Sequence, residues 1–190
     1  IPFTVQGPEN ALALDGGRTI GWEIGEQLAD AGTDRLDRMF VQVGGGAFAA
    51  CLGAGLHDVD GSIRLAAVQA EGCAPLARAW QRAHGRVEAG ALADRWSELM
   101  TPWADPHSLA DGILDDETYD WLGVFDAIGQ QGETPVVAAE SDIVAAHQLA
   151  RAAGFDVSPT GSAGLAGLLA SIDSIQPTNR VAVVMSGLAR

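Results

Sequence analysis

The sequence contains no lysine. All eleven of its basic residues are arginines, and 25 acidic residues give the 190-residue chain a formal net charge of −14. Chemistry that requires a lysine amine therefore cannot be completed by this chain alone. The excess of negative charge argues against nucleic acid and against an anionic membrane surface as partners.

Cysteine is also scarce, with Cys51 and Cys73 as its two representatives. Two cysteines do not make a disulfide framework, so a reducing, cytoplasmic environment is expected. The apolar runs are too short to span a bilayer, and the opening residues Ile1–Thr4 lack the basic and hydrophobic regions of a secretory signal. The chain does not begin with methionine, so we expect a cut or processed N-terminus. The four histidines show no ligand spacing, and no metal site is expected.

Glycine and small apolar residues, in contrast, are abundant. The chain has 24 glycines and is 47% hydrophobic, which indicates a well-filled core with many tight turns. A loop over 7–17, closed by Thr19 as a helix N-cap, is expected before a first helix that ends at Gly32. Strands alternate with helices along the rest of the chain, which predicts one α/β domain over 1–190, a three-layer αβα fold with a mostly parallel sheet. The predicted strands are 39–43, 63–69, 134–138 and 180–185, and the later helices are 47–56, 75–83, 91–100, 116–130, 141–153 and 161–172.

The most informative stretch is the turn after the first predicted strand. Gly44, Gly45 and Gly46 separate that strand from a helix of small residues, an arrangement that aims backbone N–H groups at an anion such as phosphate. A plain tight turn is the alternative. Ser186 follows the last strand, and ligands of parallel sheets bind beyond the carboxyl ends of strands, so the two strand ends could hold opposite ends of one flat cofactor. Ser186 could equally be an ordinary turn residue.

Six stretches, in order, resemble the β-family (fold type II) of pyridoxal-phosphate enzymes. This family includes threonine synthase, threonine dehydratase, cysteine synthase and the tryptophan synthase β chain. The similarity spans nearly the whole chain. The matching stretches are 15–24 (DGGRTIGWEI), 43–48 (VGGGAF), 70–72 (AEG), 108–113 (SLADGI), 158–167 (SPTGSAGLAG) and 183–187 (VVMSG).

The resemblance implies roles for six residues. The backbone amides of Gly44, Gly45, Gly46 and Ala47 would hold the phosphate of pyridoxal 5'-phosphate, with Phe48 continuing the loop into its helix; Ala47 stands where the family has a fourth glycine. Ser186 would hydrogen-bond the pyridine nitrogen. A hydroxyl can donate to an unprotonated nitrogen but cannot keep it protonated, as a carboxylate would. Such a contact suits α-proton loss coupled to elimination better than transamination.

The family's Schiff-base lysine, and the asparagine that binds its ring hydroxyl, have no counterpart here. The resemblance thus implies the C-terminal portion of such an enzyme, with no catalytic residue of its own and inactive alone. The intact enzyme would be a cytoplasmic, homodimeric lyase or synthase, acting on a small amino acid by β- or γ-elimination or replacement. A missing N-terminal half or a second chain would then supply the lysine. A non-catalytic domain that binds a phosphate-bearing ligand or regulates a partner is the alternative.

Glu71 follows the second strand, where some members of the family bind a divalent cation. The residues after it supply no second carboxylate, which again predicts no metal. We expect Glu71 to pair with an arginine or to face the edge of the cofactor.

Overall fold

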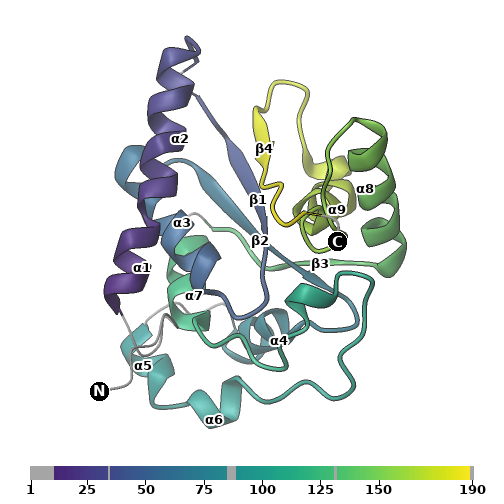
Figure 1. Ribbon diagram of the computed structural model, residues 1–190. Helices are drawn as coiled ribbons and strands as arrows, with labels where there is room; N and C mark the ends of the chain where they lie inside the picture. Colours follow the sequence, from purple (N-terminus) through teal and green to yellow (C-terminus); the bar gives the residue numbers. More distant parts are fainter. Residues whose placement is uncertain (1–10, 34, 85–88, 131, 189–190) are drawn as a thin grey trace.

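The computed structural model describes residues 11–33, 35–84, 89–130 and 132–188 (Figure 1). Its centre is a parallel four-stranded sheet in the order β3-β2-β1-β4. The strands are β1 (Arg38–Gln42), β2 (Arg64–Ala70), β3 (Val136–Ala138) and β4 (Val181–Val183). Phe40 of β1 is in register with Ala66 of β2 and Val183 of β4, so the carboxyl ends of β1 and β4 lie side by side.

Helices cover both faces of this sheet, which confirms the predicted three-layer α/β fold (Figure 1). Alternate strand residues face opposite layers. Met39 and Val41 belong to the larger core cluster, together with residues of α3, α4 and α7, whereas Phe40 and Val68 pack in a second cluster with residues of α8 and α9. The helix bounds are α3 (Ala47–Val59), α4 (Pro75–Arg82), α7 (Trp121–Gly129), α8 (Glu140–Ala152) and α9 (Ala163–Ala170).

The N-terminal part of the described chain differs from the prediction. Residues 7–10 of the expected loop over 7–17 lie outside the described residues. The remaining residues form the helix α1 (Ala11–Gly17) and not a loop. Helix α2 (Thr19–Asp30) follows almost without a break. Thr19 does not cap it, because its hydroxyl donates back to the carbonyl of Gly16. The helix does stop as predicted before Gly32, which has φ +69° and follows the C-cap residue Ala31.

Close packing against α3 explains why glycines lie inside the helices α1 and α2. A Cβ on Gly17 would lie 2.5 Å from Cys51 Sγ, and one on Gly21 would lie 2.4 Å from the backbone of Gly55. Two helices whose backbones approach this closely require glycine at the crossing. The tertiary contact therefore outweighs the local preference of glycine for turns.

The region between β2 and β3 holds two short helices, α5 (Ala89–Ala93) and α6 (Trp96–Leu99), in place of one predicted helix over 91–100. Two 3-10 turns, η2 (Asp111–Ile113) and η3 (Ile172–Ser174), lie further along the chain. The predicted helix over 116–130 begins only at Trp121, and neither Asp115 nor Asp116 caps it. The residues before Trp121 instead run along the glycine turn, where the N–H of Asp120 donates to the carbonyl of Gly45 at 2.8 Å.

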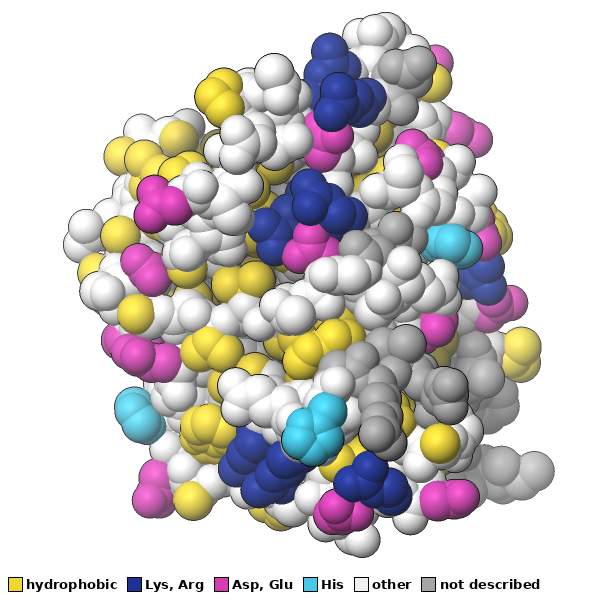
Figure 2. All heavy atoms as spheres, turned by 180° about the vertical axis from the view of Figure 1, so that it is seen from behind, with side chains coloured by type: hydrophobic (Ala, Val, Ile, Leu, Met, Phe, Trp, Pro, Cys, Tyr) yellow, Lys and Arg dark blue, Asp and Glu magenta, His cyan; other side chains and the backbone are white. Residues whose placement is uncertain are grey.

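An ion-pair network around the buried Glu133 connects the amino ends of β1 and β2 to the loop before β3. Glu133 accepts from Arg38 at 2.6 Å and lies 3.3 Å from Arg64. Basic and acidic side chains also lie next to one another over the described surface shown in Figure 2, without forming a continuous basic face there. Within the described residues, no helix combines the length and the hydropathy needed to cross a bilayer.

Candidate functional site at the carboxyl ends of β1 and β4

The glycine turn leads directly from β1 into α3. Gly46 has φ +98°, a left-handed conformation that favours glycine, and α3 begins at the next residue. Within the described chain we find no protein acceptor for the N–H groups of Gly46, Ala47 and Phe48. Free N–H groups at the start of a helix of 13 residues form a site suited to an anion.

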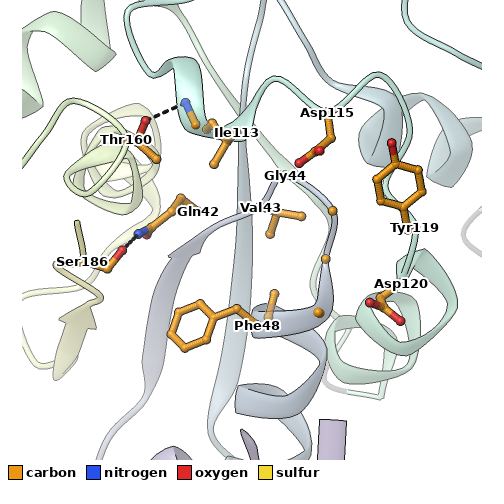
Figure 3. A pocket seen from close by; sticks show the side chains of 15 residues that line it. Gln42, Val43, Gly44, Phe48, Ile113, Asp115, Tyr119, Asp120, Thr160 and Ser186 are labelled. Carbon is orange, nitrogen blue, oxygen red and sulfur yellow. Dashed lines mark hydrogen bonds between the residues drawn. The ribbon is translucent and has the colours of Figure 1, made fainter. Parts of the chain in front are cut away.

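A cavity of about 400 Å³ opens in front of this turn (Figure 3). All six residues predicted for the site line it. The further lining residues come from the end of β1 and the residue after it, from α3, from the 112–120 segment and from the start of the 158–167 stretch: Gln42, Val43, Ala49, Gly112, Ile113, Asp115, Tyr119, Asp120 and Thr160. The structure thus brings the two strand ends together in one cavity, and the ligand that they bind stays a prediction.

Ser186 lies across the cavity from the glycine turn (Figure 3). Its N–H donates to the carbonyl of Gly161 at 3.1 Å, and its hydroxyl accepts a hydrogen bond from the side-chain amide of Gln42. A Cβ on Gly161 would overlap the Ser186 carbonyl, so glycine is required where these two loops meet. The serine is therefore held by the last strand, by the loop before α9 and by a side chain of β1.

Carboxylates lie close to the glycine turn on its other side. A Cβ on Gly44 would lie 2.3 Å from Asp115 Oδ2, so this carboxylate lies over the turn (Figure 3). Burial raises the pKa of Asp115 above its ordinary value; the Gly45 amide acts against that rise, and the charge of Asp116 adds to it. Burial also raises the pKa of Asp120. The pKa of Tyr119 is raised by burial and then by the neighbouring acidic residues.

The 108–113 stretch and the 158–167 stretch together close another rim of the cavity. The N–H of Gly112 donates to Thr160 Oγ1 at 2.9 Å (Figure 3). The Thr160 hydroxyl also lies 3.3 Å from Asp111 Oδ1. Glu71 lies outside the cavity lining and accepts from the N–H of Glu140 at 2.8 Å, where α8 begins. The described chain thus pairs Glu71 with a backbone amide and not with an arginine, and the alternative that it faces the edge of the cofactor stays a prediction.

The comparison with known proteins decides the family. The family model described as pyridoxal-phosphate dependent enzyme matches residues 2–187. This chain belongs to the pyridoxal-phosphate dependent enzyme family. The membership agrees with the order of the six stretches and with the predicted α/β fold.

Individual relatives of this pyridoxal-phosphate family span more than this chain does. A threonine synthase from Methanosarcina acetivorans is 28% identical over 171 residues, and the match covers 86% of this chain but 38% of that protein. The crystal structure of a T.th. threonine deaminase superimposes with a TM-score of 0.75 at 21% identity, over 95% of this chain and 60% of that one. Maize serine racemase gives a TM-score of 0.72 at 19% identity, over 93% and 49%.

The family's cofactor carries a phosphate and a pyridine nitrogen, and the cavity can be tested against both. The unpaired N–H groups of Gly46, Ala47 and Phe48 fit the phosphate, and the Ser186 hydroxyl opposite them fits the nitrogen. The charge of Asp115 acts against an anion at the same place. The residues present therefore fit the cofactor, with one carboxylate opposing its phosphate.

Sequence reasoning missed several residues that line this cavity. Asp115 directly precedes the predicted helix over 116–130, and nothing in the local sequence indicates that it reaches the glycine turn. Gln42 reads as one residue of a buried strand, yet its polar side chain among apolar neighbours is a signal that could have been followed. Among the described residues, no group of three or more His, Cys, Asp or Glu side chains could hold a metal ion.

Proposed function

We propose that this chain provides the phosphate and ring-nitrogen contacts of a pyridoxal-phosphate dependent lyase or synthase that acts on a small amino acid. The observation that carries the proposal is one cavity with the amides of Gly44–Ala47 on one side and the hydroxyl of Ser186 on the other. When bound, the cofactor supplies an electron sink for the carbanion formed at the α-carbon of an amino acid.

Each contact has a defined task in this proposal. The amides of Gly44–Ala47 bind the phosphate with help from the α3 dipole, and Phe48 fixes the start of that helix. The Ser186 hydroxyl would donate a hydrogen bond to the ring nitrogen and keep its proton. A hydroxyl does not hold that nitrogen protonated, which keeps the electron sink weak and favours α-proton loss coupled to β- or γ-elimination or replacement over transamination.

We further propose that the amine which bonds to the cofactor comes from outside these 190 residues. The chain has no lysine, and it spans 38% of the threonine synthase and 60% of the threonine deaminase that it matches. The missing N-terminal half or a second chain would supply the lysine, so this chain by itself is inactive. The relatives are a threonine synthase, a threonine deaminase and a serine racemase, which supports a small hydroxy amino acid, or its activated ester, as substrate. A homodimer in the cytoplasm completes the proposal.

A second candidate is a non-catalytic domain that binds a phosphate-bearing ligand or regulates a partner. The absence of lysine from these 190 residues favours this second candidate if no other polypeptide segment supplies a lysine to the site. Both candidates require anion binding at Gly44–Ala47, and they differ in whether a lysine-bearing partner restores catalysis. The gene sequence upstream of the codon for Ile1 separates them, since a reading frame with a lysine-bearing domain supports the enzyme.

The binding step is tested with Gly45→Asp. A Cβ at Gly45 meets Tyr119 at 3.2 Å, which a small shift can accommodate, so the variant should fold while placing a carboxylate where the phosphate belongs. Gly90→Asp is the matched control, because a Cβ there meets nothing within 4 Å. In a titration with pyridoxal 5'-phosphate followed by absorbance, we expect binding by the wild type and by Gly90→Asp, and none by Gly45→Asp. Equal binding by all three proteins would refute the phosphate site.

A further inference from the structure

Gln42 is the residue through which the protein core contacts Ser186. It is the last residue of β1, its side chain is buried, and its Nε2 donates to Ser186 Oγ at 2.5 Å (Figure 3). Its Oε1 has no hydrogen-bond partner in the described chain. That oxygen lies 3.2 Å from the point where a Cβ on Gly164 would sit, beside the first turn of α9.

We infer that Gln42 is a positioning residue that fixes the direction of the Ser186 hydroxyl proton. The inference rests on the proposed function. A hydroxyl has one proton and two lone pairs. The amide N–H of Gln42 occupies one lone pair, and a donor cannot receive the proton, so the Ser186 proton is left to point elsewhere. Ser186 lines the cavity, and the ring nitrogen of the cofactor is the acceptor placed there by the proposal.

The orientation of the Gln42 amide decides this direction. With Nε2 toward Ser186, the amide oxygen faces the amino-terminal turn of α9, where the helix carries partial positive charge. The opposite orientation would place the NH2 group against that positive end. The opposite orientation would also turn the amide oxygen toward Ser186. That oxygen would accept the hydrogen bond of the serine hydroxyl, and only lone pairs of the serine would then face the cavity. A buried amide oxygen without a partner is uncommon, and here it accompanies the orientation that frees the serine proton.

The consequence concerns the protonation of the ring nitrogen. A serine that donates stabilises the unprotonated nitrogen, and a serine that accepts stabilises the protonated one. Gln42 thereby holds the nitrogen unprotonated. The ionisable groups that line the cavity, Asp115, Tyr119 and Asp120, lie around the glycine turn, across the cavity from Ser186 (Figure 3).

The test uses pyridoxine 5'-phosphate labelled with ¹⁵N in the ring. This molecule has no aldehyde, so its binding needs no lysine. Its ¹⁵N chemical shift, followed against pH at saturating protein, gives the ring-nitrogen pKa in the wild type, Gln42→Glu and Gln42→Met. We expect Gln42→Glu to raise that pKa by about one unit, a tenfold change in the protonation equilibrium, because a carboxylate accepts the serine proton. Gln42→Met removes only the amide and should raise the pKa by a smaller amount.

The same substitutions in a Ser186→Ala background separate positioning from plain charge. If Gln42 acts through the serine, the effect of Gln42→Met disappears there, and that of Gln42→Glu falls to its electrostatic part. Equal shifts in both backgrounds would overturn the inference while leaving the proposed function standing. A wild-type chain that does not bind pyridoxine 5'-phosphate would refute the proposed function and this inference together. Circular dichroism checks folding, and the uncharged Gln42→Met keeps the test decisive if Gln42→Glu does not fold.

Discussion

Asp115 is the residue whose position most affects anion binding at the glycine turn. Its carboxylate lies over Gly44, and its charge repels a phosphate bound at the adjacent amides. We expect Asp115→Asn to bind inorganic phosphate or pyridoxine 5'-phosphate about tenfold more tightly at neutral pH, which corresponds to about 1.4 kcal/mol. Isothermal titration calorimetry measures the difference.

The pH dependence of this effect follows from the pKa of Asp115. Burial raises that pKa above the ordinary value, so the carboxyl becomes neutral at a higher pH than a free aspartate does. Below that pKa the wild type and Asp115→Asn carry the same charge, and the ratio of their affinities should approach one. An affinity ratio that does not change with pH would show that the charge of Asp115 is not what opposes the anion.

At the residue scale, the sequence could predict which residues of two local motifs line the cavity. Gly44 to Phe48 follow from a strand, a turn and a helix, and Ser186 follows from the end of a strand. Asp115 and Gln42 could not be predicted in their roles, because these depend on contacts between segments distant in sequence. Gln42 and Ser186 are 144 residues apart, and only the pairing of β1 with β4 makes them neighbours.

Helix α9 shows what close packing demands of a single element. A Cβ on Gly167 would lie 2.2 Å from Val68 Cγ2, a side chain in the middle of β2. We expect Gly167→Ala to lower the free energy of unfolding by about 1–3 kcal/mol, since the added methyl forces the helix away from the sheet. Denaturant unfolding followed by circular dichroism measures this loss.

Gly90→Ala provides the matched comparison for that helix. Gly90 also lies in a helix, α5, but a Cβ there meets nothing within 4 Å. Alanine should therefore stabilise the protein by about 0.5–1 kcal/mol, because it costs less conformational entropy than glycine in a helix. Equal stabilisation of both alanine variants would contradict the close contact between Gly167 of α9 and Val68 of β2.

At the element scale, prediction succeeded where periodicity and packing agree. All four predicted strands are confirmed, and each of their ends agrees with the structure within two residues. The helices after β1, β2 and β3 are also confirmed, and only the end of α3 differs from its predicted end by more than two residues. The failures come from tertiary contacts. Gly16 and Gly17 read as a turn, but both lie in α1, where Gly17 packs against Cys51 of α3. Residues 116–120 read as helix, but they run along the glycine turn, and the helix starts at Trp121.

At the scale of the whole molecule, the surface of helices α1 and α2 exposes apolar side chains. In the described chain, Leu12 is 80% exposed and Trp22 is 44% exposed. Such exposed apolar surface favours association, and two-fold dimers are the commonest oligomers. We expect a concentration-dependent dimer in analytical ultracentrifugation, and a shift toward monomer in Leu12→Glu. A strictly monomeric wild type at high concentration would contradict this expectation.

At this scale, the fold class and the family could be predicted from the sequence, because six stretches keep the family's order over nearly the whole chain. The proposed source of the amine could not, since the proposal places it outside these 190 residues, which contain no lysine. The division of labour is therefore the central claim: this chain holds the cofactor without bonding to it.

Reduction with borohydride tests that claim most directly. The purified chain is incubated with pyridoxal 5'-phosphate, reduced, digested and analysed by mass spectrometry, with ammonia release from serine and threonine measured in parallel. With no lysine present, we predict no pyridoxyl adduct on any internal residue and no turnover above the free-cofactor blank. Unreduced cofactor should still bind reversibly to the wild type and not to Gly45→Asp. An adduct on an internal side chain, or turnover above the blank, would contradict the account.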